Sequence, residues 1–210
     1  MTPQGLIATG GTAALVVGVA IFAATRLLTP SDDGFSACRS TAVAGAGAIG
    51  GPFELTSETG ARVTDRDVID GPALIYFGYT FCPDVCPVDA ARNADAATIL
   101  TEDHGLSVKP VFISVDPRRD TPDVLADFTD ALHPDMLGLT GSEDDVTATL
   151  RAYKAYASVP AEPEDEYYLV DHSAFTYLML PEAGFAEVYR REVTPEDMAE
   201  SLACYIREAA

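Results

Sequence analysis

The sequence of 210 residues carries 33 acidic and 13 basic side chains, so its formal net charge is -20 at pH 7. A surface this negative repels phosphate backbones, which excludes nucleic-acid binding as a function. Hydrophobic residues make up 48% of the chain, a normal share that allows one medium-sized domain to bury a core.

The first predicted element is a membrane-spanning helix within residues 1–28. From Leu6 to Leu28 the only charged residue is Arg26. This stretch of roughly 23 residues is long enough to cross a hydrocarbon core of about 30 Å. The apolar part of a signal peptide is shorter, about 7–15 residues, and follows a charged segment. The sequence therefore predicts a retained anchor rather than a cleaved signal peptide.

A tether and one domain are expected after the anchor. Residues 29–51 are rich in Ser, Ala and Gly, which predicts a flexible tether with Cys38 in its middle. The pattern becomes globular from Phe53 onward. We therefore expect a single domain over residues 52–210.

The first half of the domain predicts a hairpin, two buried strands and a helix. Thr59-Gly60 is a turn signal between two short segments that begin at Phe53. Continuous apolar runs of strand length follow, which are typical of strands covered on both faces. The expected strands are Pro72–Thr80 and Val108–Asp116, and the expected helix between them runs from about Asp84 to Asp103.

The second half predicts three helix starts and a second hairpin. Thr121 and Thr194 are each followed by proline, a pair that starts a helix, and Ser142 is followed by three carboxylates that favour a helix N-terminus. Ser173–Leu180 and Phe185–Arg190 suit an antiparallel pair. An early βαβ unit, this pair and a last helix predict an α/β fold, a thioredoxin-like sandwich whose central mixed sheet is flanked by helices.

Cys82 and Cys86 lie where the first buried strand ends and the next helix begins. Side chains four residues apart on a helix share a face at about 5–6 Å. A helix N-terminus also lowers the pKa of a thiol, which favours the thiolate that binds metals or attacks disulfides. The spacing has one residue more than the C-x-x-C of thioredoxin-like oxidoreductases. It favours a metal clamp and leaves a redox-active dithiol open.

The sequence has three histidines that could complete such a site. His104 is expected at the far end of the helix that begins at the cysteines, and His133 is expected in a surface loop before a proline. His172 directly precedes the strand that starts at Ser173, in a loop expected beside the start of the first helix. By sequence position alone, a surface-loop histidine is the simpler interpretation of His172.

The chain contains, in this order, the segments FGYTFCPDVCP, VFISVDPRRDTP and YLVDHSAFTYLML. Together they resemble the Sco/SenC family of copper chaperones for cytochrome c oxidase assembly, and the likeness extends from about Phe53 to Ile206. The resemblance implies that Cys82, Cys86 and His172 ligate copper. It also implies a membrane anchor, a thioredoxin-like fold and a bacterial periplasmic or mitochondrial intermembrane-space location. We expect a single-pass protein of the bacterial inner membrane with its domain in the periplasm.

The chemistry of the donor set agrees with this resemblance. Two soft thiolates favour Cu(I), and an added imidazole allows Cu(II). The same donors could hold zinc. Asp84 could hydrogen-bond near the metal or simply start the helix, and Asp171 could orient His172 or cap its loop.

The segment SVDPRRDTP is expected to support the site. Asp116 and Pro117 suit a turn beneath it. Arg118 and Arg119 could contact a partner, although an exposed basic pair is usually only solvated.

Cys38 and Cys204 are the two remaining cysteines. Unpaired thiols are unusual outside the cytoplasm, so we expect a disulfide between them that pins the tether to the domain. The alternative is two unrelated thiols.

The leading functional hypothesis is a metallochaperone rather than an enzyme. It would deliver copper to the copper-centre subunit of cytochrome c oxidase, with other copper carriers as further partners. The alternative is a thiol–disulfide reductase, in which Cys82 and Cys86 keep the copper-ligand cysteines of the oxidase reduced. A peroxidase-like thiol enzyme is a third option that nothing in the sequence requires.

Overall fold

The structure is a computed structural model that describes residues 34–39, 49–160 and 167–210. The anchor expected at residues 1–28 lies outside these ranges, as does most of the tether expected at residues 29–51. No helix in the described ranges has the length and apolar character needed to cross a bilayer.

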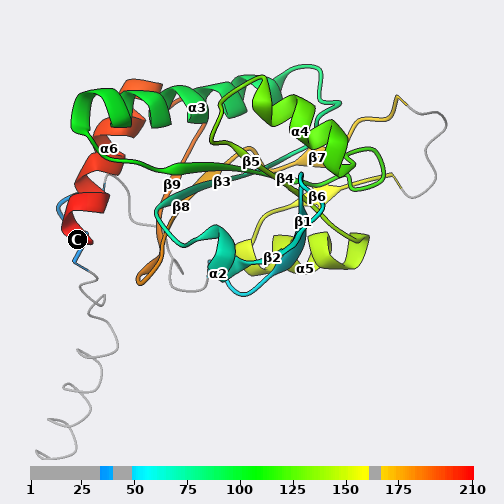
Figure 1. Cartoon of the computed structure of the whole chain (residues 1–210), viewed down its shortest axis with the longest axis horizontal. Helices are drawn as coiled ribbons and strands as arrows, with labels where there is room; N and C mark the ends of the chain where they lie inside the picture. Colours follow the sequence, from blue (N-terminus) through cyan, green and yellow to red (C-terminus); the bar gives the residue numbers. More distant parts are fainter. Residues whose placement is uncertain (1–33, 40–48, 161–166) are drawn as a thin grey trace, which may run out of the picture. The chain divides into compact units, whose positions relative to one another are not determined.

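The fold is built on a seven-stranded mixed sheet in the order β2-β1-β5-β4-β3-β8-β9 (Figure 1). The strands β3, β4 and β5 are parallel, and the other neighbouring pairs are antiparallel. Every residue of β3 is buried, as its continuous apolar run predicts for a central parallel strand. The strands are β1 Glu54–Ser57, β2 Arg62–Thr64, β3 Ala73–Gly78, β4 Lys109–Ser114, β5 Leu137–Thr140, β8 Thr176–Leu180 and β9 Gly184–Tyr189.

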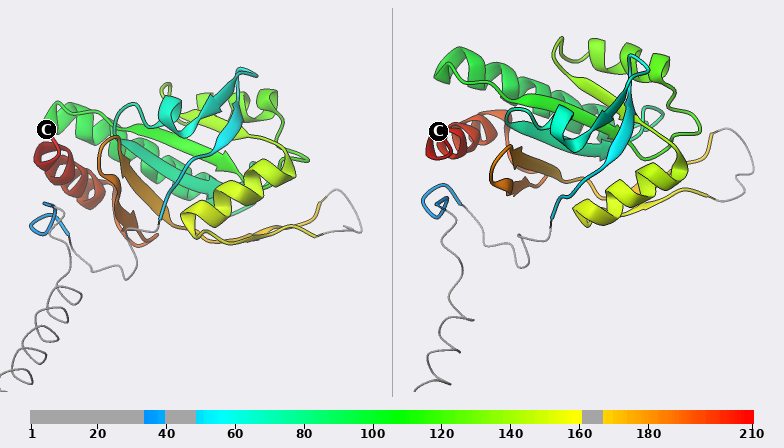
Figure 2. Two further views of the ribbon diagram at one scale, coloured as in Figure 1. Left: turned by 90° about the horizontal axis from the view of Figure 1, so that it is seen from below. Right: turned by 60° about the horizontal axis from the view of Figure 1, so that its bottom comes forward.

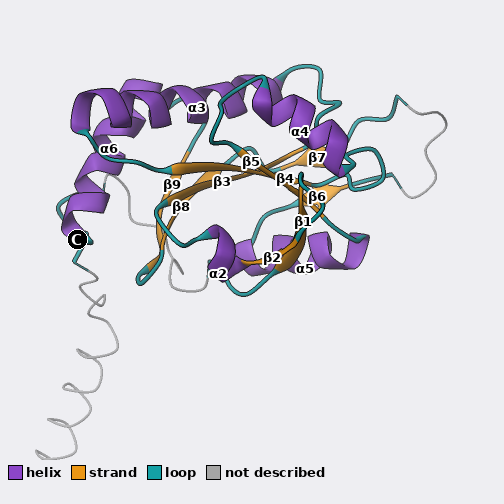
Figure 3. Cartoon of the chain, in the orientation of Figure 1, coloured by secondary structure: helices purple, strands orange, loops and turns teal. Residues whose placement is uncertain are grey.

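Helices cover both faces of this sheet. In Figures 1 and 3, α3 and α4 lie on one face and α5 on the other. Figure 2 shows α6 running beside α3, against which it packs. The helices are α2 Asp65–Val68, α3 Val85–His104, α4 Pro122–Asp130, α5 Glu143–Tyr153 and α6 Pro195–Glu208. This arrangement is the thioredoxin-like sandwich that the sequence predicts.

The three expected helix starts are confirmed by their capping contacts. The side chains of Thr121, Ser142 and Thr194 each accept a hydrogen bond from the backbone N–H three residues later. These contacts satisfy N–H groups that have no partner within the helix.

Several short elements are missed by the sequence analysis. They are α2, β5 and a separate two-stranded sheet formed by β6 (Ala157–Ser158) and β7 (Asp171–His172). Each has two to four residues, too few to show a hydrophobic period. β5 is a strand because it lies between β1 and β4 and pairs with both.

A disulfide joins Cys38 to Cys204 in α6, with 5.6 Å between the two Cα atoms. This is the pairing expected from the sequence. Beside it, the ring of Phe35 packs on Tyr205 with 5.3 Å between ring centroids, and Phe35 is only 5% exposed. Residues 34–39 are therefore attached to α6 by a covalent bond and by an apolar contact.

Candidate metal centre

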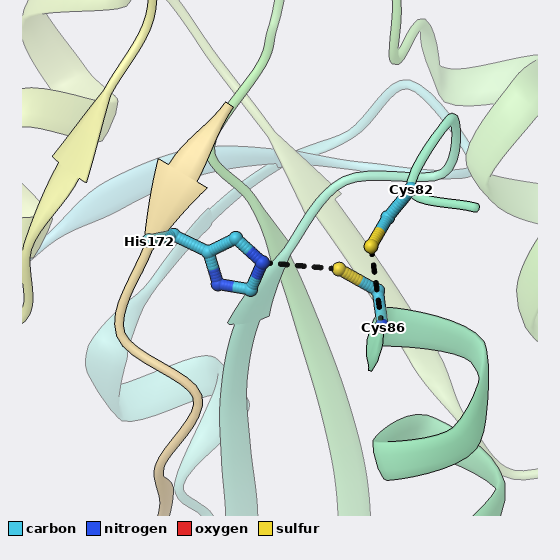
Figure 4. A group of neighbouring side chains, drawn as sticks. All are labelled: Cys82, Cys86 and His172. Atoms are coloured by element: carbon cyan, nitrogen blue, oxygen red, sulfur yellow. Dashed lines mark hydrogen bonds between the residues drawn. The ribbon is translucent and has the colours of Figure 1, made fainter. Parts of the chain in front are cut away.

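Cys82 and Cys86 lie at the carboxyl end of the central strand β3. The chain leaves β3 at Gly78, turns through a short loop that carries Cys82, and enters α3 at Val85. Cys86 is in the first turn of α3, and its backbone N–H lies 3.3 Å from Cys82 Sγ, which accepts the hydrogen bond. The loop and the helix start therefore bring both sulfurs close together beyond the carboxyl end of β3, and Figure 4 shows them side by side.

His172 reaches this point from a different part of the chain. It lies in β7, opposite Ala157 of β6. Its Nε2 is 3.2 Å from Cys86 Sγ, and its Nδ1 is 3.1 Å from the carbonyl oxygen of Ser173 (Figure 4). A carbonyl can only accept, so Nδ1 carries the proton and a neutral ring presents the lone pair of Nε2 to the sulfurs.

The three side chains form a compact donor group. Their ligand atoms, two Sγ and one imidazole nitrogen, all lie within 4.8 Å of one another. Cys86 is fully buried and Cys82 is 8% exposed, so the sulfur of Cys82 is nearer the solvent than that of Cys86. Two soft sulfurs and one imidazole nitrogen match the ligand preference of copper, and the same set is chemically compatible with zinc.

Two tyrosines from the end of β3 enclose the imidazole. The rings of Tyr76 and Tyr79 meet the His172 ring edge-on, at centroid distances of 6.3 and 5.8 Å. The hydroxyl of Tyr76 donates to Asp89 at 3.1 Å, and the hydroxyl of Tyr79 accepts from the Val170 N–H at 3.3 Å. These aromatic contacts are missed by the sequence analysis, because in a buried strand they have the same pattern as ordinary core residues.

The two thiols differ in acidity. Burial opposes ionisation of Cys82, but hydrogen bonds from Asp84 and Cys86 outweigh it and hold the pKa of Cys82 below its usual value. Burial raises the pKa of Cys86 far above that of a free thiol. The expectation that the helix N-terminus lowers the pKa of both thiols is therefore wrong for Cys86, since burial disfavours the charged thiolate. The Cys86 sulfur lies 3.2 Å from Nε2 of His172.

Burial also lowers the pKa of His172. The imidazole is therefore neutral at physiological pH, which is the form that binds a metal.

Asp84 and Asp171 are the two acidic residues expected near the metal, and they lie in different elements of the fold. Asp84 is the N-cap of α3, but its side chain makes no capping hydrogen bond. Asp171 is exposed in β7, and the Ser173 carbonyl, not Asp171, accepts the hydrogen bond from His172 Nδ1. Orientation of the ring by a main-chain carbonyl leaves no signal in the sequence.

The other two histidines lie outside this group. His104 ends α3, as expected, with its Nε2 3.7 Å from Glu200. His133 follows α4, where its Nδ1 accepts from the Asp135 N–H at 3.1 Å.

The segment after β4 supports the loop that carries Cys82. Asp120 is fully buried and accepts hydrogen bonds from the Thr80 hydroxyl at 2.6 Å, the Thr80 N–H at 3.1 Å and the Ser114 hydroxyl at 2.5 Å. Asp116, also fully buried, accepts from the hydroxyl of Tyr168 at 2.8 Å. The expected support from this turn is present, and Asp120 contributes to it although the sequence analysis does not single it out.

Comparison with known proteins gives the family. The family model described as SCO1/SenC matches residues 41–207. This chain belongs to the SCO1/SenC family. The resemblance predicted from the three sequence segments is thereby confirmed.

Relatives of this SCO1/SenC protein occur in bacteria and in mitochondria. Protein SenC of Rhodobacter capsulatus is 52% identical over 199 residues, which cover 95% of this chain and 89% of that protein. The mitochondrial SCO1 homolog 1 of Arabidopsis thaliana is 40% identical over 165 residues, 79% of this chain. The chain spans about half the length of this plant relative, 49%.

A solved structure of the family contains copper. The crystal structure of Arabidopsis thaliana ScoI with copper bound is 40% identical to this chain, covers 77% of it and is itself covered to 99%, with a TM-score of 0.72. The thioredoxin-like sandwich described above is therefore the fold of a copper-binding relative.

Proposed function

We propose that Cys82, Cys86 and His172 bind copper, and that this protein is a metallochaperone for the binuclear copper centre of cytochrome c oxidase. The observation that carries the proposal is the approach of the two sulfurs and the imidazole nitrogen to within 4.8 Å of one another. A relative crystallised with copper supports the choice of metal. A structural relative of 24% identity, BsSco, is a member of the Sco family of cytochrome c oxidase assembly proteins, which supports the choice of client.

The geometry supports delivery by ligand exchange. Copper is the cargo, so it must bind firmly and still leave when a partner offers its own thiolates. Cys82 is more exposed and more acidic than Cys86. Cys82 is therefore the sulfur that an incoming thiolate displaces first, while Cys86 and His172 hold the ion. A site with only three donors leaves the ion open to that attack.

Copper binding requires the thiols to lose their protons. The raised pKa of Cys86 means that its proton is released only when the metal replaces it. The neutral His172 already presents Nε2 and needs no deprotonation at physiological pH. Copper loading is therefore coupled to proton release at the cysteines.

The proposal includes a place in the cell. We assign residues 1–28 to a single-pass anchor in the bacterial inner membrane, residues 29–51 to a tether, and residues 52–210 to a copper-binding domain in the periplasm. The apolar stretch from Leu6 to Leu28 and the similarity to a bacterial SenC protein support this. A disulfide between Cys38 and Cys204 fits an oxidising compartment.

One observation favours a second function for the same residues. A thiol of lowered pKa beside a thiol of raised pKa is the arrangement of a dithiol reductant, in which the first attacks a disulfide and the second resolves the mixed disulfide. The substrate would be the oxidised copper-ligand cysteines of the oxidase, whose disulfide is reduced as Cys82 and Cys86 form their own.

Anaerobic copper titration of the reduced full-length chain tests the proposal. We expect one copper per chain and, with Cu(II), an absorption band from thiolate-to-metal charge transfer that is weakened or lost in His172→Ala. His133→Ala is the matched control, because it removes a histidine outside the site, and it should retain the wild-type band. Identical bands in all three proteins would remove His172 from the site. Weak copper binding in the wild type would leave the dithiol reductase as the better function.

A further inference from the structure

The guanidinium of Arg119 lies between the two chain segments that supply the ligands. Its side chain is only 18% exposed, and its Nε donates to the buried carboxylate of Asp116. Its Nη1 donates to the carbonyl oxygen of Tyr168 at 2.9 Å, and its centre lies 3.6 Å from the centroid of the Tyr168 ring. Arg119 is therefore fixed to the segment that leads to His172 by a hydrogen bond and by stacking.

The same guanidinium contacts the loop that leads to Cys82. Its centre lies 4.9 Å from the ring centroid of Phe81 and 5.6 Å from that of Tyr79. Phe81 is the residue directly before Cys82, and Tyr79 meets the His172 ring edge-on. One cation thus contacts aromatic rings from both segments, each within the distance of a cation–π interaction.

The main chain joins the two segments only beyond the ligands, where Thr176 of β8, four residues after His172, pairs with Tyr76 of β3. His172 belongs to the two-stranded sheet of β6 and β7, whereas the loop with Cys82 continues β3 of the seven-stranded sheet. Within the described ranges, no ladder of backbone hydrogen bonds connects the two sheets. The pairing of β8 with β3 and side-chain contacts together set the position of His172 relative to the sulfurs, and Arg119 makes several of these contacts.

We infer that Arg119 is a positioning residue that holds His172 against the cysteine pair. The inference rests on the proposed copper site, and it gives Arg119 no contact with the metal. Without Arg119 the two cysteines keep their relative geometry, which the hydrogen bond from the Cys86 N–H to Cys82 Sγ holds, and His172 loses its fixed distance from them. Cu(I), which two thiolates can bind, is then retained, and Cu(II), which needs the imidazole, is bound more weakly.

Arginine is the residue that this position requires. Its planar group stacks on Tyr168 while its edge donates to Asp116 and to the Tyr168 carbonyl. A lysine carries the same charge but has neither the plane nor the fork of donors. Arg119→Lys should therefore fail to restore the site.

Arg118 provides a matched control on the same turn. It is exposed, and its Nε donates to Glu143 at 2.7 Å. Arg118→Gln removes one positive charge from the same loop and leaves the contacts of Tyr168, Tyr79 and Phe81 unchanged. An effect of general charge would appear in both variants, and an effect of positioning only in the variants of Arg119.

The experiment compares the full-length wild type with Arg119→Gln, Arg119→Lys and Arg118→Gln. The first readout needs no metal: amide hydrogen exchange at Val170, whose N–H bonds to Tyr79, should accelerate at least tenfold in both Arg119 variants. The second readout is copper: Cu(II) affinity should fall at least tenfold in these variants, while Cu(I) binding stays within about threefold of wild type. Arg118→Gln should match the wild type in both readouts.

Each measured result either supports or overturns the positioning role of Arg119. Wild-type exchange and wild-type Cu(II) affinity in the Arg119 variants would overturn the inference, as would equal losses in Arg118→Gln. If Arg119→Gln does not fold, Arg119→Lys, which keeps the charge, decides the question. Failure of the wild type to bind copper would refute the proposed function, and the exchange at Val170 would still show whether Arg119 holds the His172 segment in place.

Discussion

Removal of the disulfide between Cys38 and Cys204 should lower the stability of the whole domain. The bond closes a loop with a sequence separation of 166 residues. According to the chain-entropy relation, closing a loop of this length raises the free energy of the unfolded state by about 5 kcal/mol. Removal of a native disulfide typically lowers the free energy of unfolding by about 2–5 kcal/mol. We therefore expect the free energy of unfolding to fall by about 2–5 kcal/mol in the double variant Cys38→Ser/Cys204→Ser.

Guanidinium unfolding of the full-length chain, followed by far-UV circular dichroism, measures this loss. The chain has no tryptophan, so circular dichroism is a better probe than intrinsic fluorescence. The double variant should also show a steeper denaturant dependence, because its unfolded chain is less compact. A loss below about 1 kcal/mol with an unchanged denaturant dependence would refute the reasoning.

Phe35→Ala distinguishes loss of the cross-link from loss of local packing. Phe35 is 5% exposed, so its burial contributes about 1.5–3 kcal/mol. If the segment stays packed without the disulfide, Phe35→Ala lowers stability by the same amount in both backgrounds. If the segment detaches, Phe35→Ala has no effect in the double variant.

Two further predictions follow from the site. Iodoacetamide should modify Cys82 faster than Cys86 in the reduced, copper-free protein, because Cys82 has the lowered pKa and the greater exposure. Tandem mass spectrometry locates the adduct. Equal or reversed rates would contradict the higher acidity and exposure of Cys82. The free energy of unfolding should also fall as the pH drops below about 6.5, the pKa of a histidine in an unfolded chain. Burial lowers the pKa of His172, so the native state binds a proton at this residue less readily than the unfolded chain does. Stability curves of wild type, His172→Ala and the control His133→Ala check this: the fall below pH 6.5 should be smaller in His172→Ala only.

The sequence predicts the long elements and the cysteine pair well, for local reasons. A continuous apolar run identifies β3, and Thr or Ser before a first-turn proline or carboxylate identifies the starts of α4, α5 and α6. The sequence places Cys82 and Cys86 at the junction of strand and helix, as observed. The helical spacing rule does not explain their approach, because Cys82 lies in the loop before α3 and its sulfur accepts a hydrogen bond from the Cys86 N–H.

The rest of the site depends on contacts between distant residues. His172 lies 86 positions from Cys86, and only the family resemblance connects the two in the sequence. Tyr79, Asp120 and Arg119 each support the site through a hydrogen-bond partner that lies at least 40 positions away. Such contacts have no period and no local spacing, so residue patterns alone cannot reveal them.

The disulfide at Cys38 also sets how far the copper site can travel. We propose that residues 1–28 are an anchor. The disulfide fixes Cys38 to α6, so the tether between anchor and domain ends at Cys38 instead of at the start of the domain at residue 52. Covalent geometry limits an extended chain to about 3.5 Å per residue, so ten residues span at most about 35 Å and the full tether of 23 residues about 80 Å. Reduction of this bond together with release of the Phe35 contact would more than double the maximum distance between the anchor and the domain. If residues 1–28 anchor the protein as we propose, the disulfide keeps the domain closer to that anchor than the full tether would allow.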